Sequence, residues 1–336
     1  MQILDKYLTG IGIDISEHHI RIAKVSIFGG VKKLEEIELP DGLIVDEKVE
    51  KLDEVKKIVS EKIKKSFSST PVRATLLFPE SRVFSSSFIL PKSVKKAQVL
   101  EESKKIAQKE IPIPFLIAQV SASQGGTESG GTRTTLYAVE SEHAAGFQNI
   151  VSTTPFNLIV VEANTKSILR LVSKYRDKKH LPKSSKELII VIDVGHSWGS
   201  VAAYTLRGSS VFSRSISYKS LSKDKEGQGK LSGEVVDSIV GTIRKVMVYF
   251  NQREQKVVSI YVSGFEALDK KLNTELEKIS SKETPVLLLS KVIKLANVDD
   301  NKLHKFGASI GAALRSVSPR RYAYQHNLLK NEKYEE

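Results

Sequence analysis

The sequence of 336 residues predicts an α/β protein into which a small, mixed α+β subdomain is inserted. Three observations predict this fold class. Short apolar strands alternate with amphipathic helices along the chain. An apolar strand that runs into Ile-Asp, a short polar turn and a second strand occurs twice, at residues 13–16 (IDIS) and 192–195 (IDVG). A repeat so far apart indicates a duplicated core rather than a solenoid. Residues 80–152 contain a polar helix, a proline-rich segment and a glycine-rich segment between short strands, and they form the predicted insertion.

The chain begins with paired strands. Residues 9–15 and 20–27 alternate in polarity and are rich in β-branched side chains, which predicts two strands joined by a tight turn. Apolar residues at helical spacing within residues 47–65 predict an amphipathic helix. Residues 73–78 predict a short buried strand, which ends at Pro79 because proline cannot continue the hydrogen-bond ladder.

The predicted insertion contains strands and one polar helix. A strand is predicted at residues 83–90 and a helix at 93–109. The segment 111–115 (IPIPF) is not helical, because each proline fixes φ and disfavours helix before it. Two further strands are predicted at 116–122 and 133–139. The glycine-rich stretch 124–131 between them predicts a flexible hairpin loop; no helix follows it, so a phosphate cradle is not expected there.

The second half repeats the alternation of strands and helices. A buried strand at 158–161 and a helix precede the charged segment 177–186, which contains a proline and predicts a domain boundary. After it, strands are predicted at 187–193, 200–206, 211–216, 257–262 and 286–289, and helices at 235–250 and 268–279. The expected organisation is a first unit (1–79 and 153–182), the insertion (80–152), a second unit (186–317) and a tail (318–336).

Composition excludes several classes of function. The chain has no cysteine, so disulfides, iron–sulfur ligation and thiol nucleophiles are excluded. Lys and Arg exceed Asp and Glu by 52 − 39 = 13, which favours acidic partners or, alternatively, reflects a solvated, lysine-rich surface. Only 7% of residues are aromatic and they do not alternate with basic ones, so no nucleic-acid partner is expected. We find no membrane-spanning apolar run and no secretory signal, so a cytoplasmic location is expected.

The repeated Ile-Asp segments form the main candidate site. A short turn of small residues after an aspartate presents backbone N–H groups to phosphate, and the aspartate can hold a hydrated Mg²⁺. The candidate residues are therefore Asp14 and Ser16 in the first copy, and Asp193, Gly195 and His196 in the second. The alternative interpretation is that each aspartate caps its own turn.

A competing motif lies in the second copy. Residues 195–199 (GHSWG) match G-x-S-x-G, the turn that presents the nucleophile of α/β-hydrolases, and they follow a predicted strand. Ser197 would then need a helix after it and a downstream acid and histidine. The candidates are Asp269, Asp299, Asp300, His304 and His326. Against an esterase, no histidine–glycine oxyanion segment precedes the motif, and the first Ile-Asp copy is left unexplained.

No metal site is expected. His18 and His19 are adjacent, so on an extended chain their side chains point to opposite sides and cannot easily chelate one ion. The other histidines are scattered along the sequence.

Taken together, these residues resemble actin-like ATPases and, more narrowly, the PilM family of type IV pilus assembly proteins. Residues 12–15 (GIDI) and 193–195 (DVG) match the two phosphate loops of the family. Residues 72–91 are similar to its entry into an inserted subdomain. Residues 109–115 resemble its YIPFP segment, and residues 306–315 resemble its A-x-G-x-A-L-R helix. The resemblance covers nearly the whole chain.

The resemblance implies two actin-like lobes of the ribonuclease-H type, with ATP and Mg²⁺ in the cleft between them. It implies a cytoplasmic scaffold of the pilus machine, or of a related secretion system, at the inner face of the membrane. Such a scaffold binds the N-terminal peptide of a PilN-like inner-membrane protein. Contacts with pilus motor ATPases, with acidic lipids and with further copies of the chain are expected as well.

Three departures from the family pattern predict that ATP binding is weak or lost and that hydrolysis is absent. The first loop continues with residues 16–18 (SEH) where the family has Gly-Ser-Ser, and the carboxylate of Glu17 would repel phosphate. The adenosine segment Ser-Gly-Gly-Gly is SGFE here, so only Gly264 matches and Phe265 crowds the backbone. A polar linker after Tyr218 replaces the outer subdomain of the second lobe. The alternative is a working ATP-binding protein of the FtsA type, which acts in cell division.

The tail carries one further resemblance. Residues 325–330 (QHNLLK) are similar to the Ile-Asn-Leu-Leu-Pro peptide with which the membrane partner docks. This similarity suggests the hypothesis that the tail occupies the chain's own groove or that of a neighbour. The alternative is an amphipathic C-terminal stub. The sequence does not indicate which residues form the groove.

Overall fold

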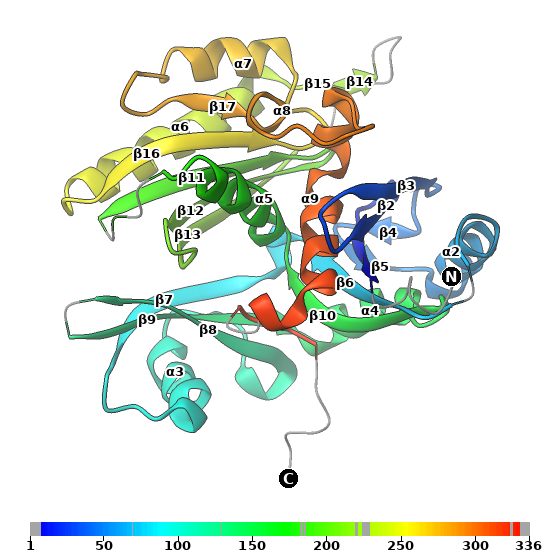
Figure 1. The fold of residues 1–336 in the computed structure, drawn as a ribbon, viewed down its shortest axis with the longest axis horizontal. Coiled ribbons are helices and arrows are strands. Elements are labelled where there is room, and N and C mark those ends of the chain that lie inside the picture. The colour runs from blue at the N-terminus through cyan, green and yellow to red at the C-terminus, as the bar shows by residue number, and fades with distance from the viewer. Residues whose placement is uncertain are drawn as a thin grey trace.

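A long buried helix lies between two five-stranded sheets in the computed structural model, and a three-stranded sheet lies to one side of it (Figure 1). The structure describes residues 8–68, 70–128, 130–181, 184, 186–218, 221–223, 229–322 and 325–329. Each large sheet, with the helices that cover it, forms one lobe.

The first sheet has the strand order β10-β6-β1-β2-β3. Its strands are β1 (Thr9–Ile15), β2 (His19–Ser26), β3 (Val31–Glu38), β6 (Val72–Phe78) and β10 (Phe156–Ala163). The first three are antiparallel, whereas β6 and β10 run parallel to β1. The two predicted strands at the start of the chain are confirmed. The sequence did not predict β3, because its charged residues obscure the period of two.

Two helices, α2 (Leu52–Ser66) and α4 (Ser141–Val151), pack against the first sheet. The helix predicted at residues 47–65 begins at Leu52, so its predicted start is wrong. Asp46 and Glu47 have φ angles of 47° and 59°. In this left-handed region the chain turns between two short strands, β4 (Ile44–Val45) and β5 (Lys48–Val49), instead of starting a helix.

The small sheet has the order β7-β9-β8 and is covered by α3 (Val99–Ala107). Its strands are β7 (Phe84–Pro91), β8 (Ala118–Glu128) and β9 (Gly131–Glu140), and the 3₁₀ turns η1 (Glu80–Arg82), η2 (Lys96–Gln98) and η3 (Phe115–Ile117) flank them. The glycine-rich stretch predicted as a loop is largely strand. β8 continues to Glu128, with a register shift between Gln124 and Thr127 that accommodates the glycines.

The second sheet has the order β13-β12-β11-β16-β17, which repeats the topology of the first. Its strands are β11 (Glu187–Val194), β12 (Trp198–Thr205), β13 (Ser210–Ser217), β16 (Lys256–Ser263) and β17 (Val286–Leu288). α6 (Gly233–Asn251) and α7 (Lys270–Glu277) cover one face, and α8 (Leu289–Val292) follows β17. The described residues between Tyr218 and α6 include only the short pair β14 (Leu221–Lys223) and β15 (Gly229–Lys230).

Two helices join the lobes. α5 (Asn164–Lys178) and α9 (Asp300–Val317) share a hydrophobic core with both large sheets. α9 is buried along most of its length, and β1 approaches it so closely that a Cβ on Gly12 would lie 1.9 Å from the carbonyl oxygen of Ser309. After α9, the 3₁₀ turn η4 (Pro319–Tyr322) leads toward the tail, whose residues 325–329 lie against the first lobe.

Candidate functional site

The duplication brings the two predicted aspartates to one place. Asp14 lies near the end of β1 and Asp193 near the end of β11, and both line a small cavity between the lobes. Asn164, at the start of α5, donates a hydrogen bond from its Nδ2 to Oδ2 of Asp193 over 2.8 Å. Gly195, His196 and Gly264 line the same cavity.

Negative charge is unfavourable in this cavity. Burial raises the pKa of Asp193 to about 7, and the carboxylate of Asp14 contributes to the rise. Burial also raises the pKa of Asp14, although Arg21 opposes it. Glu47 lines the cavity as well, and burial raises its pKa to about 8 against the effect of Arg82. Burial thus disfavours the ionised form of three carboxyl groups in this cavity, which Arg21 and Lys305 also line.

The two turns use their own backbone groups. The backbone N–H and the hydroxyl of Ser16 both donate to the carbonyl of His19, over 2.9 and 3.0 Å. The N–H of Gly195 donates to the carbonyl of Trp198 over 2.8 Å. The hydroxyl of Tyr218 donates to the carbonyl of Gly195 over 2.8 Å, which fixes the second turn. These two N–H groups, which would face a phosphate in an open loop, are therefore already bonded.

Gly264 lets the chain pass close to the end of β11. Its φ is 105°, and a Cβ there would lie 2.4 Å from the backbone nitrogen of Val194 and 2.7 Å from Oδ1 of Asp193. Only glycine fits such an approach at this φ. The glycine is therefore needed for the local packing itself, whether or not a ligand is bound.

Phe265 lies in the cleft and contacts both lobes. Its ring centre lies 6.3 Å from that of His19 and 6.0 Å from that of His196. The guanidinium carbon of Arg21 and the Nζ of Lys305 lie 5.4 and 5.5 Å from the ring centre, at cation–π distance. These two cations also pair with one carboxylate, that of Glu36. Residues of the first sheet, of the second lobe and of α9 thus close around one aromatic ring.

Little space is left in the cleft. The cavity measures about 70 Å³, whereas small-molecule sites usually measure about 300–1,000 Å³. The residues present here therefore do not fit a nucleotide, and we derive no chemistry through one. Within the described ranges, no group of three or more His, Asp or Glu side chains has the arrangement of a metal site.

The geometry required of a hydrolase nucleophile is not present at Ser197. That motif needs a strand followed by a sharp turn and a helix. Here the serine lies in the hairpin turn between antiparallel β11 and β12, so a strand follows it. The candidate histidines have other contacts: Nε2 of His304 lies 3.0 Å from the hydroxyl of Ser290, and His326 stacks on Tyr137.

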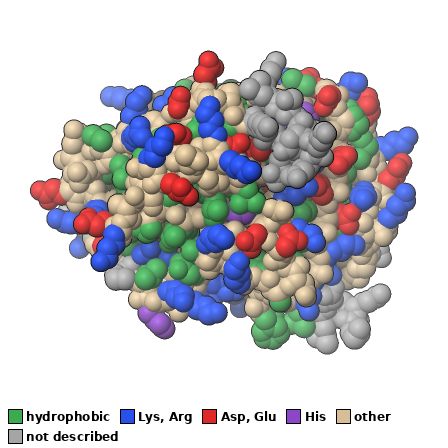
Figure 2. Space-filling model, turned by 90° about the horizontal axis from the view of Figure 1, so that it is seen from above, with side chains coloured by type: hydrophobic (Ala, Val, Ile, Leu, Met, Phe, Trp, Pro, Cys, Tyr) green, Lys and Arg blue, Asp and Glu red, His purple; other side chains and the backbone are tan. Residues whose placement is uncertain are grey.

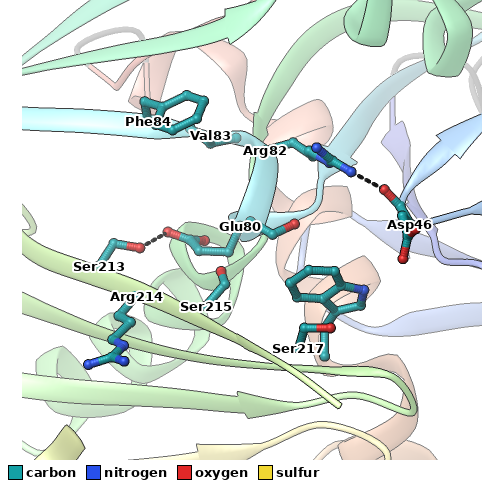
Figure 3. Close-up of a pocket in the computed structure, with 11 residues that line it drawn as sticks. Asp46, Glu80, Arg82, Val83, Phe84, Ser213, Arg214, Ser215 and Ser217 are labelled. Atoms are coloured by element: carbon teal, nitrogen blue, oxygen red, sulfur yellow. Dashed lines mark hydrogen bonds between the residues drawn. The ribbon is translucent and has the colours of Figure 1, made fainter. Parts of the chain in front are cut away.

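A wider, open pocket of about 530 Å³ lies beside the cleft, with Glu80 on its wall (Figure 3). One oxygen of Glu80 accepts hydrogen bonds from the backbone N–H and the hydroxyl of Thr165, over 3.2 and 2.7 Å. The other accepts from the hydroxyl of Ser213 over 2.7 Å. Glu80 thus links η1 to α5 and to β13, and both of its carboxylate oxygens accept hydrogen bonds within the protein.

The groove at the free edge of β10 holds the tail. The side-chain Oδ1 of Asn327 accepts from the N–H of Val161 over 2.9 Å, and its Nδ2 donates to the carbonyl of Ile159 over 3.0 Å. The N–H of Leu328 donates to the carbonyl of Val161 over 2.7 Å. From the other wall of the groove, the hydroxyl of Ser121 on β8 accepts from the N–H of Asn327 over 2.9 Å.

Side chains of the tail also fill the groove. Leu328 is 1% exposed and belongs to the hydrophobic core of the first lobe. The ring of His326 stacks on Tyr137 of β9 with a centroid distance of 3.7 Å. Its Nε2 accepts from the N–H of Ala163 over 3.2 Å. Burial, together with the nearby Arg315, lowers the pKa of His326 well below its usual range.

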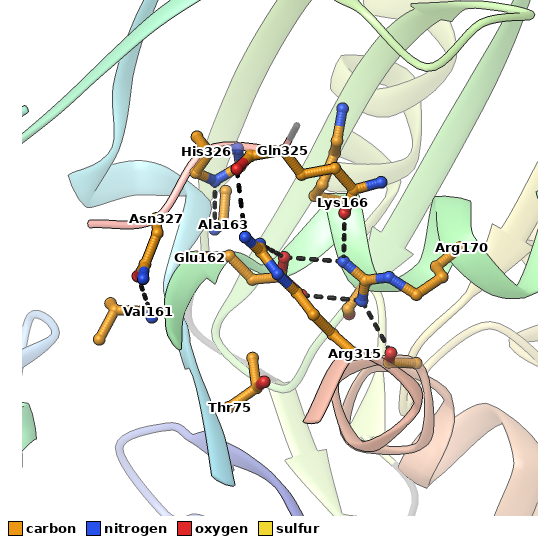
Figure 4. Close-up of polar contacts among 12 residues, drawn as sticks. Thr75, Val161, Glu162, Ala163, Lys166, Arg170, Arg315, Gln325, His326 and Asn327 are labelled. Atoms are coloured by element: carbon orange, nitrogen blue, oxygen red, sulfur yellow. Dashed lines mark hydrogen bonds and ion pairs between the residues drawn. The ribbon is translucent and has the colours of Figure 1, made fainter. Parts of the chain in front are cut away.

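A buried ion cluster lies below the tail (Figure 4). Arg170 holds Glu162 of β10 through two hydrogen bonds of 2.8 Å, and Arg315 of α9 pairs with the same carboxylate. Burial raises the pKa of Glu162, but these two guanidiniums outweigh it and bring the pKa to about 2. Both arginines also bond Gln325, at its side chain and its carbonyl. The cluster therefore connects the tail to α5, α9 and β10.

Sequence reasoning located the cleft but not the groove. The peptide resemblance singled out Asn327 and its neighbours, whereas Ile159, Val161 and Ala163 act through backbone groups that any residue possesses. Only the position of β10 at the edge of its sheet marks these groups as available.

The duplicated sheets, the cleft between them and the inserted subdomain define a protein of the actin-like fold. Two solved structures support this class. The ethanolamine utilization protein EutJ from Carboxydothermus hydrogenoformans matches 91% of this chain over 89% of its own, with a TM-score of 0.51 and 12% identity. A protein of actin-like ATPase fold and unknown function from Bacteroides thetaiotaomicron matches 88% of this chain over 95% of its own, with a TM-score of 0.50 and 10% identity.

The chain belongs to the PilM family of type IV pilus assembly proteins, because the sequence model of that family matches residues 12–219. A solved PilM–PilN type IV pilus biogenesis complex contains a chain that this one resembles with a TM-score of 0.70 and 16% identity. The match covers 93% of this chain and 100% of that one. No curated protein matches the sequence significantly. The predicted family and fold class are thus confirmed.

Among the described helices, none combines the length and the apolar character needed to cross a membrane.

Proposed function

We propose that this chain is a scaffold of type IV pilus assembly, or of a related secretion system, that binds the N-terminal peptide of a PilN-like inner-membrane protein. Membership of the PilM family supports the role in pilus assembly, and the likeness to a chain of a PilM–PilN complex suggests the partner. The observation that carries peptide binding is the groove at β10, where an Asn-Leu-Leu segment lies against the strand edge.

Binding of a PilN-like peptide is tested by fluorescence anisotropy. A labelled peptide that begins with Ile-Asn-Leu-Leu-Pro is titrated with a chain in which Asn327 and Leu328 are both replaced by alanine, so that the tail no longer fills the groove. Saturable binding is expected, and a control peptide with Ala in place of its Asn should bind at least about tenfold more weakly, because it loses bonds to a buried edge. Absence of binding at high micromolar protein would argue against the proposal.

The cleft has no catalytic role in this proposal. The raised pKa values of Asp14 and Asp193, the position of Phe265 and the small cavity all support weak or absent ATP binding. We expect millimolar Mg-ATP to leave the thermal unfolding temperature unchanged. A stabilisation that disappears in Asp14→Ala or Asp193→Ala would instead favour the FtsA-type alternative.

The proposed location is the cytoplasmic side of the inner membrane. The net charge of +13 supports attraction to acidic lipids. Lys and Arg side chains are interspersed with Asp and Glu over the face shown in Figure 2, so this face has no single basic patch. We therefore assign the membrane contact to the PilN-like partner first and to the charge of this chain second. Contacts with motor ATPases and between copies of the chain are further parts of the proposal.

A further inference from the structure

We propose that residues 325–329 act as a built-in competitor, which occupies in the same molecule the groove that the partner peptide uses. The identity of the competing peptide rests on the proposed function. The docking of the tail itself rests only on contacts within this chain.

The strand edge provides a row of backbone partners. Val161 and Ala163 are alternate residues of β10, so their outward backbone groups face the same side, and Ile159 precedes them at a register shift between Leu158 and Val160. All three bond the tail: Ile159 and Val161 bond Asn327, and Ala163 bonds His326. Peptides commonly bind at a free sheet edge; here the described bonds are one between backbones, from the N–H of Leu328 to the carbonyl of Val161, and several from the side chains of Asn327 and His326.

Specificity comes from the amide of Asn327. Its Oδ1 accepts from two N–H groups, those of Val161 and Leu329, while its Nδ2 donates to the carbonyl of Ile159. Aspartate would place a second acceptor against that carbonyl, and leucine would leave all three groups unpaired. The groove thus reads an asparagine followed by a buried leucine, Leu328. The tail and a peptide of the Ile-Asn-Leu-Leu type meet the same requirement.

The tail has an advantage because it is tethered. Only the segment from Ser318 to Gln325 separates the end of α9 from the groove. A short linker gives an effective concentration on the order of millimolar. Any peptide that binds from solution needs a groove that the tail has left, so its apparent affinity is the intrinsic affinity multiplied by the undocked fraction. We expect a reduction of at least about tenfold for binding in the unaltered chain.

The test compares three full-length proteins by anisotropy with two labelled peptides, Gln-His-Asn-Leu-Leu-Lys from the tail and Ile-Asn-Leu-Leu-Pro from the partner. The proteins are the unaltered chain, the double variant Asn327→Ala/Leu328→Ala, and Arg320→Ala, a control at an exposed position outside the groove. The double variant should bind both peptides at least tenfold more tightly than the other two proteins. Its helical circular dichroism should match that of the unaltered chain, because the substitutions lie outside regular elements.

Each outcome separates the two proposals. If the tail peptide binds the double variant more tightly but the partner peptide binds none of the proteins, the docking of the tail in the groove is supported, whereas its role as a competitor of a PilN-like peptide is rejected together with that partner. If the tail peptide binds the double variant no better than the unaltered chain, or binds neither, the competitor is rejected whatever the partner peptide does. Light scattering completes the test. The proposal expects the same oligomeric state for the unaltered chain and the double variant, and a dimer that dissociates only in the double variant would show that tails are exchanged between molecules.

Discussion

Gly12 lies where β1 crosses α9, and the carbonyl of Ser309 occupies the space that a Cβ would need. We expect Gly12→Ala to lower the free energy of unfolding by more than about 3 kcal/mol, because backbone atoms on two buried elements must separate. Gly241→Ala on α6 is the matched control: its Cβ meets nothing within 4 Å, and alanine should stabilise the helix by about 0.5–1 kcal/mol. Urea denaturation measures both variants. Equal effects would contradict this account of Gly12.

Asp193 gives a pH dependence whose sign follows from its raised pKa. The folded state favours the protonated carboxyl, so its contribution to stability is full below pH 4 and is lost as the pH rises to about 7. Asp193→Asn cannot ionise and keeps an oxygen that can accept from Asn164. The melting temperature of the variant minus that of the unaltered protein should therefore be larger at pH 8 than at pH 5. An identical difference at both values would show that Asp193 titrates normally.

The sequence made some of these residues visible and concealed others. Asp14 and Asp193 could be predicted because each ends a strand in a repeated pattern, and Phe265 because it replaces an expected glycine. Their pKa shifts could not be predicted, because these depend on which groups the fold brings together. The two arginines on Glu162 follow no motif: Arg170 is 8 positions from Glu162, whereas Arg315 is 153 positions away.

Among the elements, the edge strand β10 allows a direct test of whether the tail is docked in solution. The tail bonds the amide groups of Val161 and Ala163. In Asn327→Ala/Leu328→Ala we expect both amides to exchange hydrogen at least about tenfold faster than in the unaltered protein, because Val161 loses its partner Asn327 and the released tail carries His326 away from Ala163. The amide of Ile13, in the central strand β1, serves as an internal control and should not change. Unchanged exchange at β10 would mean that the tail does not protect the edge in solution.

Most elements were predictable because the polarity pattern of their side chains follows their burial and their secondary structure. Buried strands such as β11 are almost wholly apolar, and α6 places apolar residues at helical spacing. β3 and the start of α2 were missed for different reasons. β3 is a largely charged outer strand, and the turn at Asp46 and Glu47 uses left-handed backbone angles that residues other than glycine seldom adopt.

In the whole molecule, one hydrophobic core belongs to both lobes. It contains Val25 and Leu77 from the first sheet, Val191 and Tyr261 from the second, and apolar residues of α5 and α9. Calorimetry should therefore show a single unfolding transition, with calorimetric and van't Hoff enthalpies in agreement. Two resolved transitions would indicate that the lobes unfold independently and that the shared core contributes little.

At this scale the sequence was a good guide. The repeated Ile-Asp segments predicted two related units, and the strand orders of the two large sheets are the same. The closure of the cleft was only partly predictable. The sequence showed that Phe265 crowds one loop, but the approach of His19 and Arg21 from β2 and of Lys305 from α9 exists only in the folded chain.

The two large sheets differ most at their last strands. β17 has three residues, whereas β10, its counterpart, has eight. A long bare strand at a sheet border invites pairing with strands of other molecules and hence aggregation. In the second sheet this edge strand, β17, is short, which reduces the risk. In the first sheet the edge strand β10 is long, and the tail covers it. Under the proposed exchange of peptides, a newly made molecule would be shielded from self-association until a partner peptide replaces the tail at this strand.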